Sequence, residues 1–391
     1  MYFQALDDKS ECVGVYVNGE LHFKESPANL TKTWKYSGSI GDPSVEYAWL
    51  YCHGKKLEEV CPKTLAEELK RAQKKFGAYL KSFRLAKINL NDNCFFDLVP
   101  ESFLMEFCEV KNKITKHVFE TYDRPPNYQF LDGVQKLLHK MRYRELNVNK
   151  VDCRSLYYSS EGRLTANDLI ENRRYMDYNL FGTVTGRLTT LPNSFPILTV
   201  KKKFRKLLKP HNDWFLSLDY NAAEIRTFIS LAGQEQPQED IHNWNIKNIF
   251  DNKCNRADAK ALFFSWFYNP ESNLIQKDCY DRKKVLDKWF KQGYIVTPRK
   301  RKIIVDERRA LSYLIQSDTS DRVLSRAVEI DRLLEKRSSF VSHIVHDEIV
   351  IDYKEKDQDY VLKIKQIFEK DNFKANVAVG KNYLDFKELN I

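Results

Sequence analysis

The sequence has little of what marks a membrane, secreted or repetitive protein. No apolar run approaches the roughly 18 residues of a membrane span, and the N-terminus "MYFQALDDKS" lacks the basic-then-apolar order of a signal peptide. The eight cysteines form no C-x-x-C pair and no Cys/His ligand spacing, which argues against structural zinc and predicts reduced thiols. With only 13 Gly and 12 Pro, the chain is neither collagen-like nor of low complexity. We therefore expect a cytoplasmic protein without a membrane partner.

The composition is that of an ordered, basic protein. Apolar residues make up 42% and aromatic residues 13% of the 391 positions, which is enough to build the cores of two or three domains. Lys and Arg outnumber Asp and Glu by 64 to 54, which suits either a polyanionic partner or an ordinary basic surface. Two basic runs, "KKKFRKLLK" (201–209) and "RKRK" (299–302), can be solvated faces or phosphate contacts.

The first 150 residues divide into two patterns. Residues 1–62 alternate in polarity, with Asn18-Gly19 as a hairpin turn, which predicts a β-rich region. Residues 63–150 have helical spacing, with basic side chains along the polar faces of "KTLAEELKRAQKKFGAYLKSF" and "LDGVQKLLHKMRYREL". No internal repeat is visible.

Two carboxylates in the second half lie where strands are expected to end. "WFLSLDYNAAEIRTFISLAG" predicts a strand ending at Asp219, then a helix over 222–232 that Asn221 caps and Gly233 stops. Asp347 lies in "HDE", at a tight turn between the apolar strands "SHIV" and "IVIDY". Two carboxylates at adjacent strand ends can share a pair of divalent cations, the arrangement used in phosphoryl transfer. Either motif alone is more often only a turn.

A third motif lies between these carboxylates. In "RADAKALFFSWFYN", Arg256, Lys260, Phe264 and Tyr268 recur every fourth residue, so on a helix they form one slanted stripe. Two cations followed by two aromatic rings match a nucleotide, with its phosphates, sugar and base. The aromatic residues alone would favour a helix that faces the core, but the two cations on the same stripe do not.

Together with "TVTGRLTT" (183–190), these motifs resemble a family A DNA polymerase, which is the bacterial Pol I-like family, and in particular its short phage type. "TVTGRLTT" is similar to the family's primer-strand motif, "DYNAAEIR" (219–226) to motif A, the stripe to motif B and "HDE" to motif C. The blocks occur in the family's order within residues 150–391. The resemblance implies an α+β right-hand fold with an antiparallel palm sheet and helical fingers and thumb. A phage-encoded chain would act in the host cytoplasm.

The resemblance also implies how the chain is divided. We expect a β-rich N-terminal region, interpreted as a vestigial exonuclease, then a helical thumb-like region, the first part of the palm, the fingers, and the second part of the palm with motif C, at residues 1–62, 63–150, 151–235, 236–300 and 301–391. Only 25 residues separate Tyr268 from Tyr294, so the fingers are trimmed relative to bacterial relatives. The short exonuclease-like patterns near the N-terminus do not define a site, and we expect no proofreading.

The metal and catalytic residues follow from the resemblance. Asp219, Asp347 and the carbonyl of Tyr220 would ligate two Mg²⁺ ions, for which Mn²⁺ can substitute. Glu348 would flank the ions as a further catalytic residue. Lys260 would donate a proton to the leaving pyrophosphate.

The same resemblance implies the substrate contacts. The nucleotide-binding residues would be Tyr220, Glu224, His242, Arg256, Lys260, Phe264 and Tyr268. Three of these, His242, Arg256 and Lys260, would hold the triphosphate, and Glu224 would exclude ribonucleotides at the 2′ position. Phe264 would face the sugar and Tyr268 the templating site. The DNA contacts would be Arg187, Arg308, Gln316 and His346.

The implied activity is DNA-templated addition of dNTPs to a primer 3′ end, in phage-type replication or repair. The expected partners are primer-template DNA and dNTPs, with room for a processivity factor, and we expect a monomer. A single-subunit RNA polymerase is the first alternative, although Glu224 and Glu348 argue against it. The second is a catalytically silent, nucleic-acid-binding replication scaffold.

Overall fold

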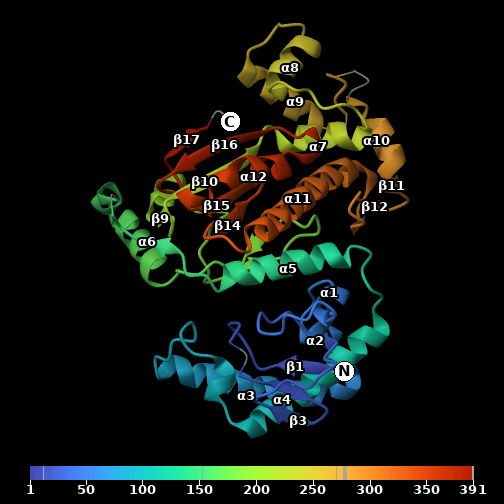
Figure 1. Cartoon of the computed structure of the whole chain (residues 1–391). Coiled ribbons are helices and arrows are strands. Elements are labelled where there is room, and N and C mark those ends of the chain that lie inside the picture. Colours follow the sequence, from blue (N-terminus) through green and yellow to red (C-terminus); the bar gives the residue numbers. More distant parts are fainter. Residues whose placement is uncertain (12, 152, 270, 276–279, 390–391) are drawn as a thin grey trace. The chain divides into compact units, whose positions relative to one another are not determined.

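The structure is a computed structural model that describes residues 1–391 except 12, 152, 270, 276–279 and 390–391. The chain divides into two compact units, Met1–Tyr143 and Arg144–Ile391 (Figure 1). None of the described helices is long and apolar enough to cross a membrane.

Short strands and two short helices form the start of the first unit. The strands are β1 (Phe3–Ala5), β2 (Val15–Val17), β3 (Glu20–His22), β4 (Lys32–Thr33) and β5 (Glu46–Tyr47). The first three form an antiparallel sheet in sequence order, and β4 pairs with β5 in parallel. The predicted hairpin turn is confirmed, since Asn18 and Gly19 join β2 to β3 with φ of 51° and 89°. Two helices, α1 (Ala48–Tyr51) and α2 (Leu57–Val60), follow.

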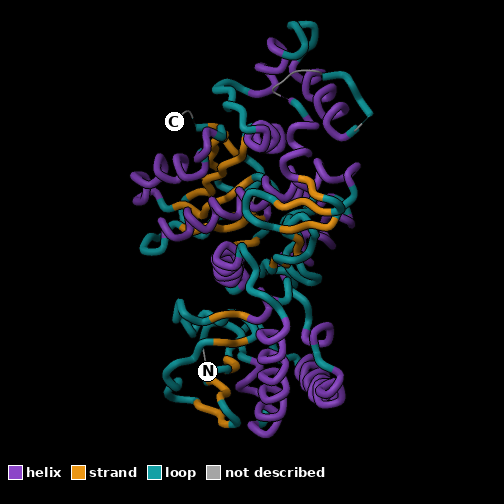
Figure 2. The backbone as a smooth tube through the Cα atoms, turned by 90° about the vertical axis from the view of Figure 1, so that its right-hand side faces the viewer, coloured by secondary structure: helices purple, strands orange, loops and turns teal. Residues whose placement is uncertain are grey.

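Three longer helices complete the first unit. They are α3 (Ala66–Leu85), α4 (Glu101–Thr121) and α5 (Tyr128–Arg142), with the 3₁₀ turns η1 (Lys63–Leu65) and η2 (Phe95–Leu98). α3 and α4 lie side by side and antiparallel (Figure 2), because Phe76 stacks on Phe107 while Tyr79 packs on Phe103. The helical spacing of the sequence corresponds to α3 and α5, although α5 ends at Arg142, earlier than the quoted segment.

A five-stranded antiparallel sheet is the centre of the second unit, in the order β14-β15-β10-β16-β17. Its strands are β10 (Trp214–Tyr220), β14 (Phe340–Val345), β15 (Glu348–Tyr353), β16 (Ala375–Gly380) and β17 (Phe386–Glu388). The smaller sheets are built from β6 (Asn147–Val148), β7 (Tyr178–Asn179), β8 (Thr189–Thr190), β9 (Leu208–Lys209), β11 (Phe290–Lys291), β12 (Tyr294–Val296) and β13 (Lys302–Ile304). β6 pairs with β9, β7 with β8, and β11-β12-β13 form a meander.

The second unit also contains several helices. They are α6 (Ser160–Glu171), α7 (Ala223–Ala232), α8 (Ile241–Asn248), α9 (Arg256–Tyr268), α10 (Arg282–Trp289), α11 (Glu307–Leu334) and α12 (Val361–Phe368), with the 3₁₀ turns η3 (Arg154–Tyr158), η4 (Lys202–Leu207), η6 (Glu355–Tyr360) and η7 (Lys370–Asn372). The long helix α11 packs against α7, α12 and β14, and α11 and α12 lie together on the sheet (Figure 1).

The alternation of side chains along β10 places Asp219 on the face opposite to α12. Leu216, Leu218 and Tyr220 are buried, and Tyr220 stacks on Phe368 of α12 at 3.9 Å between ring centroids. Because successive side chains of a strand point to opposite faces, Asp219 lies on the face away from α12. The periodicity of the strand therefore keeps its one carboxylate out of the apolar layer.

Helix α9 buries a different side from the stripe noted in the sequence. Ala259, Phe263, Trp266 and Phe267 are buried, and the aromatic three pack with α7 and α10 in one core. Arg256, Lys260 and Tyr268 are exposed. The stripe is therefore not the core-facing side of the helix.

The predicted cap of α7 is wrong, and its predicted end is confirmed. The helix begins at Ala223, after Ala222 in a left-handed conformation with φ of 54° and no side-chain cap. Asn221 does not cap it, because its side chain donates to Asp240 (2.8 Å) and accepts from the backbone N–H of Ile241 (3.2 Å). Gly233 ends the helix with φ of 72°.

Gly233→Ala should lower the free energy of unfolding of the second unit by about 1 kcal/mol, since a left-handed C-cap disfavours any Cβ. An added Cβ would meet no atom within 4 Å, so the backbone conformation alone accounts for the effect. Urea unfolding checks this. The control is Gly77→Ala in the middle of α3, also free of close atoms, which should stabilise its unit by about 0.5–1 kcal/mol. An unchanged Gly233→Ala protein would contradict the argument.

Candidate active site

A cavity of about 350 Å³ opens in the second unit, where β10, the β14–β15 turn, α7, α8, α9 and α11 meet. Its lining residues are Arg187, Asp219, Tyr220, Asn221, Ala222, Ala223, Glu224, His242, Arg256, Lys260, Phe264, Thr319, Ser320, His346, Asp347 and Asn376. The structure thus gathers most of the residues singled out in the sequence. Four of them, Tyr268, Arg308, Gln316 and Glu348, are not in the lining.

Two carboxylates approach the cavity from adjacent strands. Asp219 of β10 pairs across the sheet with Glu348 of β15, and Asp347 lies in the turn just before Glu348. Burial, and then the charges of Asp347 and Glu348, raise the pKa of Asp219 to about 7. Burial also raises the pKa of Asp347. The negative charge here is thus only partly compensated by the protein, with Lys260 as the group that lowers the pKa of Asp219.

Two non-glycine residues beside these carboxylates have left-handed backbones. Ala222, three residues after Asp219, has φ of 54°, and His346, next to Asp347, has φ of 56°. Such conformations cost of order 1 kcal/mol and concentrate at functional sites. Both residues line the cavity.

Glu348 turns its carboxylate to a separate hydrogen-bonded group. Ser217 donates to one oxygen (2.6 Å) and Tyr383 to the other (3.0 Å). Burial raises the pKa of Glu348, and these two hydrogen bonds partly offset the rise. Both of its oxygens have partners, so Glu348 supports the strand pairing beside Asp219 and is not part of the cavity wall.

The opposite wall is cationic. Asp240 caps α8 by accepting from the backbone N–H of His242 and Asn243, and it also accepts from Arg256 (2.9 Å). Burial lowers the pKa of His242, and its Nδ1 has no hydrogen-bond partner among the described residues. Arg256 and Lys260 therefore present two positive charges to the cavity, which His242 also lines.

Glu224 is held from two sides. Arg187 donates to one of its oxygens (2.6 Å) and the Tyr268 hydroxyl donates to the other. Burial, and then the bond to Glu224, raise the pKa of Tyr268. The ring of Tyr268 stacks on Phe264 with 6.0 Å between centroids. Tyr268 does not line the cavity itself, but it contacts two residues that do, Glu224 and Phe264.

The two remaining predicted DNA contacts lie on α11. Arg308 is exposed in its first turn, and Gln316 donates to Ser312 (3.2 Å). Residues 308, 312, 316 and 320 recur every fourth position, which places them on one stripe of the helix. Since Ser320 lines the cavity, this stripe leads away from it along α11.

Three cavity residues lie outside the motifs noted in the sequence. Asn376 is the partner of Asp219 on β16, and Thr319 and Ser320 come from the middle of α11. A polar residue within "ANVAVG" was the only available signal for Asn376. Its place beside Asp219 depends on strand register, which the sequence does not show.

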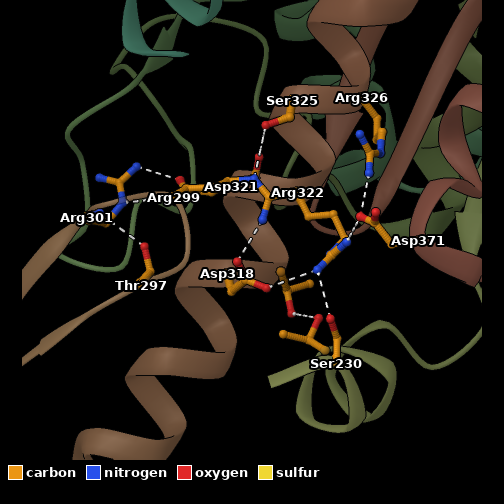
Figure 3. Close-up of polar contacts among 12 residues, drawn as sticks. Ser230, Thr297, Arg299, Arg301, Asp318, Asp321, Arg322, Ser325, Arg326 and Asp371 are labelled. Atoms are coloured by element: carbon orange, nitrogen blue, oxygen red, sulfur yellow. Dashed lines mark hydrogen bonds and ion pairs between the residues drawn. The ribbon is translucent and has the colours of Figure 1, made fainter. Parts of the chain in front are cut away.

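The two arginines of the basic run "RKRK" form neither a solvated face nor phosphate contacts. Arg299 pairs with Asp318 (2.7 Å) and Arg301 with Asp321 (2.6 Å), and both carboxylates are buried (Figure 3). In the other run, Lys201 pairs with the exposed Glu161 (2.6 Å).

The carboxylate oxygens of the cavity suit a hard cation that is bound partly by the protein and partly by a substrate. Among the described residues, no group of three or more His, Cys, Asp or Glu side chains is arranged to hold a metal ion. Mg²⁺ is commonly bound through one or two carboxylates and substrate phosphates, without an all-protein cage. Asp219 and Asp347, with raised pKa values from burial, fit that mode.

No protein-family model and no curated protein matches the sequence. Among solved structures, the chain is similar to the POL domain of Pol1 from M. smegmatis, in complex with DNA primer-template and dNTP. The TM-score is 0.55 at 13% sequence identity, covering 72% of this chain and 76% of that chain. This chain has the fold of a polymerase domain. At this identity the likeness concerns the fold alone, and it agrees with the expected mixture of helices and antiparallel sheet.

Asp219→Asn should raise the free energy of unfolding at pH 8 by about 1 kcal/mol or more, and much less at pH 4. The pKa of Asp219 is about 7 when folded and ordinarily 3.8. The folded state therefore holds an extra proton between these values, and stability falls as the pH rises from about 4 through 7. Denaturant unfolding at both pH values measures the difference.

Asp213→Asn is the control, just before the other end of β10. Hydrogen bonds from the Glu355 backbone and Lys354 lower the pKa of Asp213, so its replacement should not stabilise the protein at pH 8. Equal stabilisation by Asp219→Asn at both pH values would show that the carboxylate is not strained by burial.

Proposed function

We propose that this chain is a DNA-templated DNA polymerase of family A, of the short phage type, which adds dNTPs to a primer 3′ end. The observation that carries the proposal is the cavity itself: two partly buried carboxylates, Asp219 and Asp347, line it together with Arg256, Lys260 and His242. Separately, the fold is similar to that of a polymerase domain. This division of charge suits a triphosphate bound through cations at one end and hard oxygen ligands at the other.

The first part of the mechanism concerns charge at the reacting phosphate. Asp219, Asp347 and the Tyr220 carbonyl would hold two Mg²⁺ ions, which supply Lewis-acid stabilisation of the attacking and leaving oxygens when bound. Arg256 and Lys260 would neutralise the triphosphate, and His242, which also lines the cavity, would add a further contact to it. Catalysis here needs positioning and charge neutralisation more than covalent chemistry by the protein.

The transfer forms a phosphoester bond and breaks the phosphoanhydride bond between the α- and β-phosphates. The primer 3′ oxygen loses its proton to solvent and bonds to the α-phosphorus, while the bond to the bridging oxygen of the β-phosphate breaks. Lys260 donates a proton to the departing pyrophosphate. Arg187 and His346, both in the cavity lining, would contact the primer end, and Arg308 and Gln316 would extend the DNA contact along α11.

Selection of the sugar is assigned to Glu224. Its carboxylate is fixed by Arg187 and Tyr268, so it cannot swing away to admit a 2′ hydroxyl without breaking both bonds. Phe264, stacked with Tyr268, forms the adjoining surface for the sugar. The proposal includes no proofreading step and no partner beyond primer-template DNA and dNTPs, and it applies to replication or repair alike.

Asp347→Asn should reduce extension of a labelled primer on a DNA template with Mg²⁺ and dNTPs by at least about 100-fold, since it removes a carboxylate proposed to hold both ions. Mn²⁺ should also support the wild-type reaction. Glu348→Gln is the matched variant one residue away, and because Ser217 and Tyr383 already hold that side chain, it should stay within about tenfold of wild type. If the wild type binds primer-template DNA but extends it with neither metal, the scaffold function replaces the polymerase.

Glu224→Ala should lower the preference for dNTPs over rNTPs by about tenfold or more, measured as the ratio of kcat/KM values. Removal of the carboxylate opens the space that the 2′ hydroxyl would occupy. Tyr268→Phe, which removes one of the two bonds to Glu224, should have a smaller effect in the same direction. A wild type that prefers rNTPs would identify the single-subunit RNA polymerase instead.

A further inference from the structure

The loop that delivers Arg187 to the cavity is closed on itself. It follows β7 and leads to β8, and the backbone N–H of Gly186 donates to the Thr183 carbonyl (3.2 Å). The Thr183 hydroxyl donates to the Arg187 carbonyl (2.9 Å). Gly186 has φ of 78°, a left-handed conformation that suits glycine at this turn. Arg187 therefore leaves a tight loop whose placement sets the position of its side chain.

One arginine lies directly against this loop. A Cβ on Gly186 would stand 2.5 Å from Cζ and Nη2 of Arg301 and 2.9 Å from its Nε. These are its three nearest atoms, and all belong to one guanidinium group. The planar group thus packs on the Cα of Gly186, in space that any other side chain would occupy.

The guanidinium group of Arg301 is itself held in place by α11. Its Nε and Nη2 both donate to Asp321 of α11 (3.1 and 2.6 Å), and the Asp321 side chain is 0% exposed. The turn that carries Arg301 is closed by the Arg301 backbone N–H, which donates to the Thr297 hydroxyl (3.1 Å) (Figure 3). Such a bidentate pair fixes the plane as well as the place of the guanidinium.

A second bond ties the same loop to the same helix. Ser320, next to Asp321 on α11, donates to the carbonyl of Gly186 (3.0 Å). Gly186 is therefore held by Arg301 at its Cα and by Ser320 at its carbonyl, and both attachments depend on adjacent residues of α11.

We propose that Arg301, fixed by Asp321, is a positioning residue that sets the place of Arg187 in the cavity. The proposal rests on the proposed function, in which Arg187 contacts the primer strand. The triphosphate contacts come from α8 and α9, which Arg301 does not hold. Loss of the Arg301–Asp321 pair should therefore affect use of the primer and, through the Arg187–Glu224 bond, the choice of sugar, while the triphosphate contacts stay nearly unchanged.

The same turn supplies a matched control. Arg299 also forms a buried pair, with Asp318 (2.7 Å), but none of the three atoms closest to Gly186 belongs to it. Asp318 keeps Arg322 as a second partner (3.3 Å), so Arg299→Met leaves no buried carboxylate unpaired. Arg301→Met alone would strand Asp321, and the double variant Arg301→Met/Asp321→Asn avoids that cost.

The first measurement is hydrogen exchange of the full chain in the peptide covering residues 183–190. The double variant should increase exchange in this loop by about tenfold or more, and Arg299→Met should not. Arg301→Lys keeps a charge for Asp321 without the planar group, and should give an intermediate increase if the double variant does not fold. Equal exchange in the wild type, Arg301→Lys and the double variant would overturn the proposal.

The second measurement is primer extension by the same proteins. The double variant should raise the KM for primer-template DNA about tenfold, with the KM for dNTP within about threefold of wild type, and Arg299→Met should change neither. A uniform loss of kcat in both arginine variants would mean a general structural role and would overturn the proposal. A different outcome is that the double variant increases hydrogen exchange in the loop but the wild type extends no primer. That result would overturn the proposed function and leave the positioning of the loop by Arg301 supported.

Discussion

The pairing of β10 with β15 is the interaction on which the rest of the second unit depends. Its register sets Asp219 opposite Glu348, and so brings Asp347 in the adjoining turn to the same end of the sheet. A shift by one residue would turn Asp219 into the apolar layer under α12 and expose Leu218 in its place. The cost of burying a carboxylate there, together with the loss of apolar contacts, keeps the register fixed.

Charge in the cavity is kept separated rather than neutralised. The carboxylates of Asp219 and Asp347 lie on the sheet, while Arg256 and Lys260 lie on α9. Burial raises the pKa values of Asp219 and Asp347, and Arg256 is paired with Asp240. A site that leaves its own charges incompletely paired is less stable than it could be, and such an arrangement is typical of a cavity adapted to a charged ligand.

Helix α11 connects the parts that surround the cavity. One of its sides contributes Thr319 and Ser320 to the lining. Its buried charged side chains form ion pairs with residues of neighbouring turns. The partners are Arg299 and Arg301 in the β12–β13 turn and Asp371 in the turn after α12 (Figure 3). Buried pairs contribute little net stability but tolerate few alternative geometries. Their value here is that they fix the loops around the helix.

The sequence by itself determined the local elements and the types of residue at the site. Apolar runs that end at a carboxylate or a turn predicted β10 and the β14–β15 hairpin, fourfold spacing predicted α9 and its stripe, and Gly233 ended α7, because these signals are properties of short segments. Tertiary structure alone decided that Asn221 binds Asp240 instead of capping α7, that the two arginines of "RKRK" pair with buried carboxylates, and that Asn376 joins the site. Each of these depends on which distant residue lies opposite, and register and packing between segments leave no trace in local sequence.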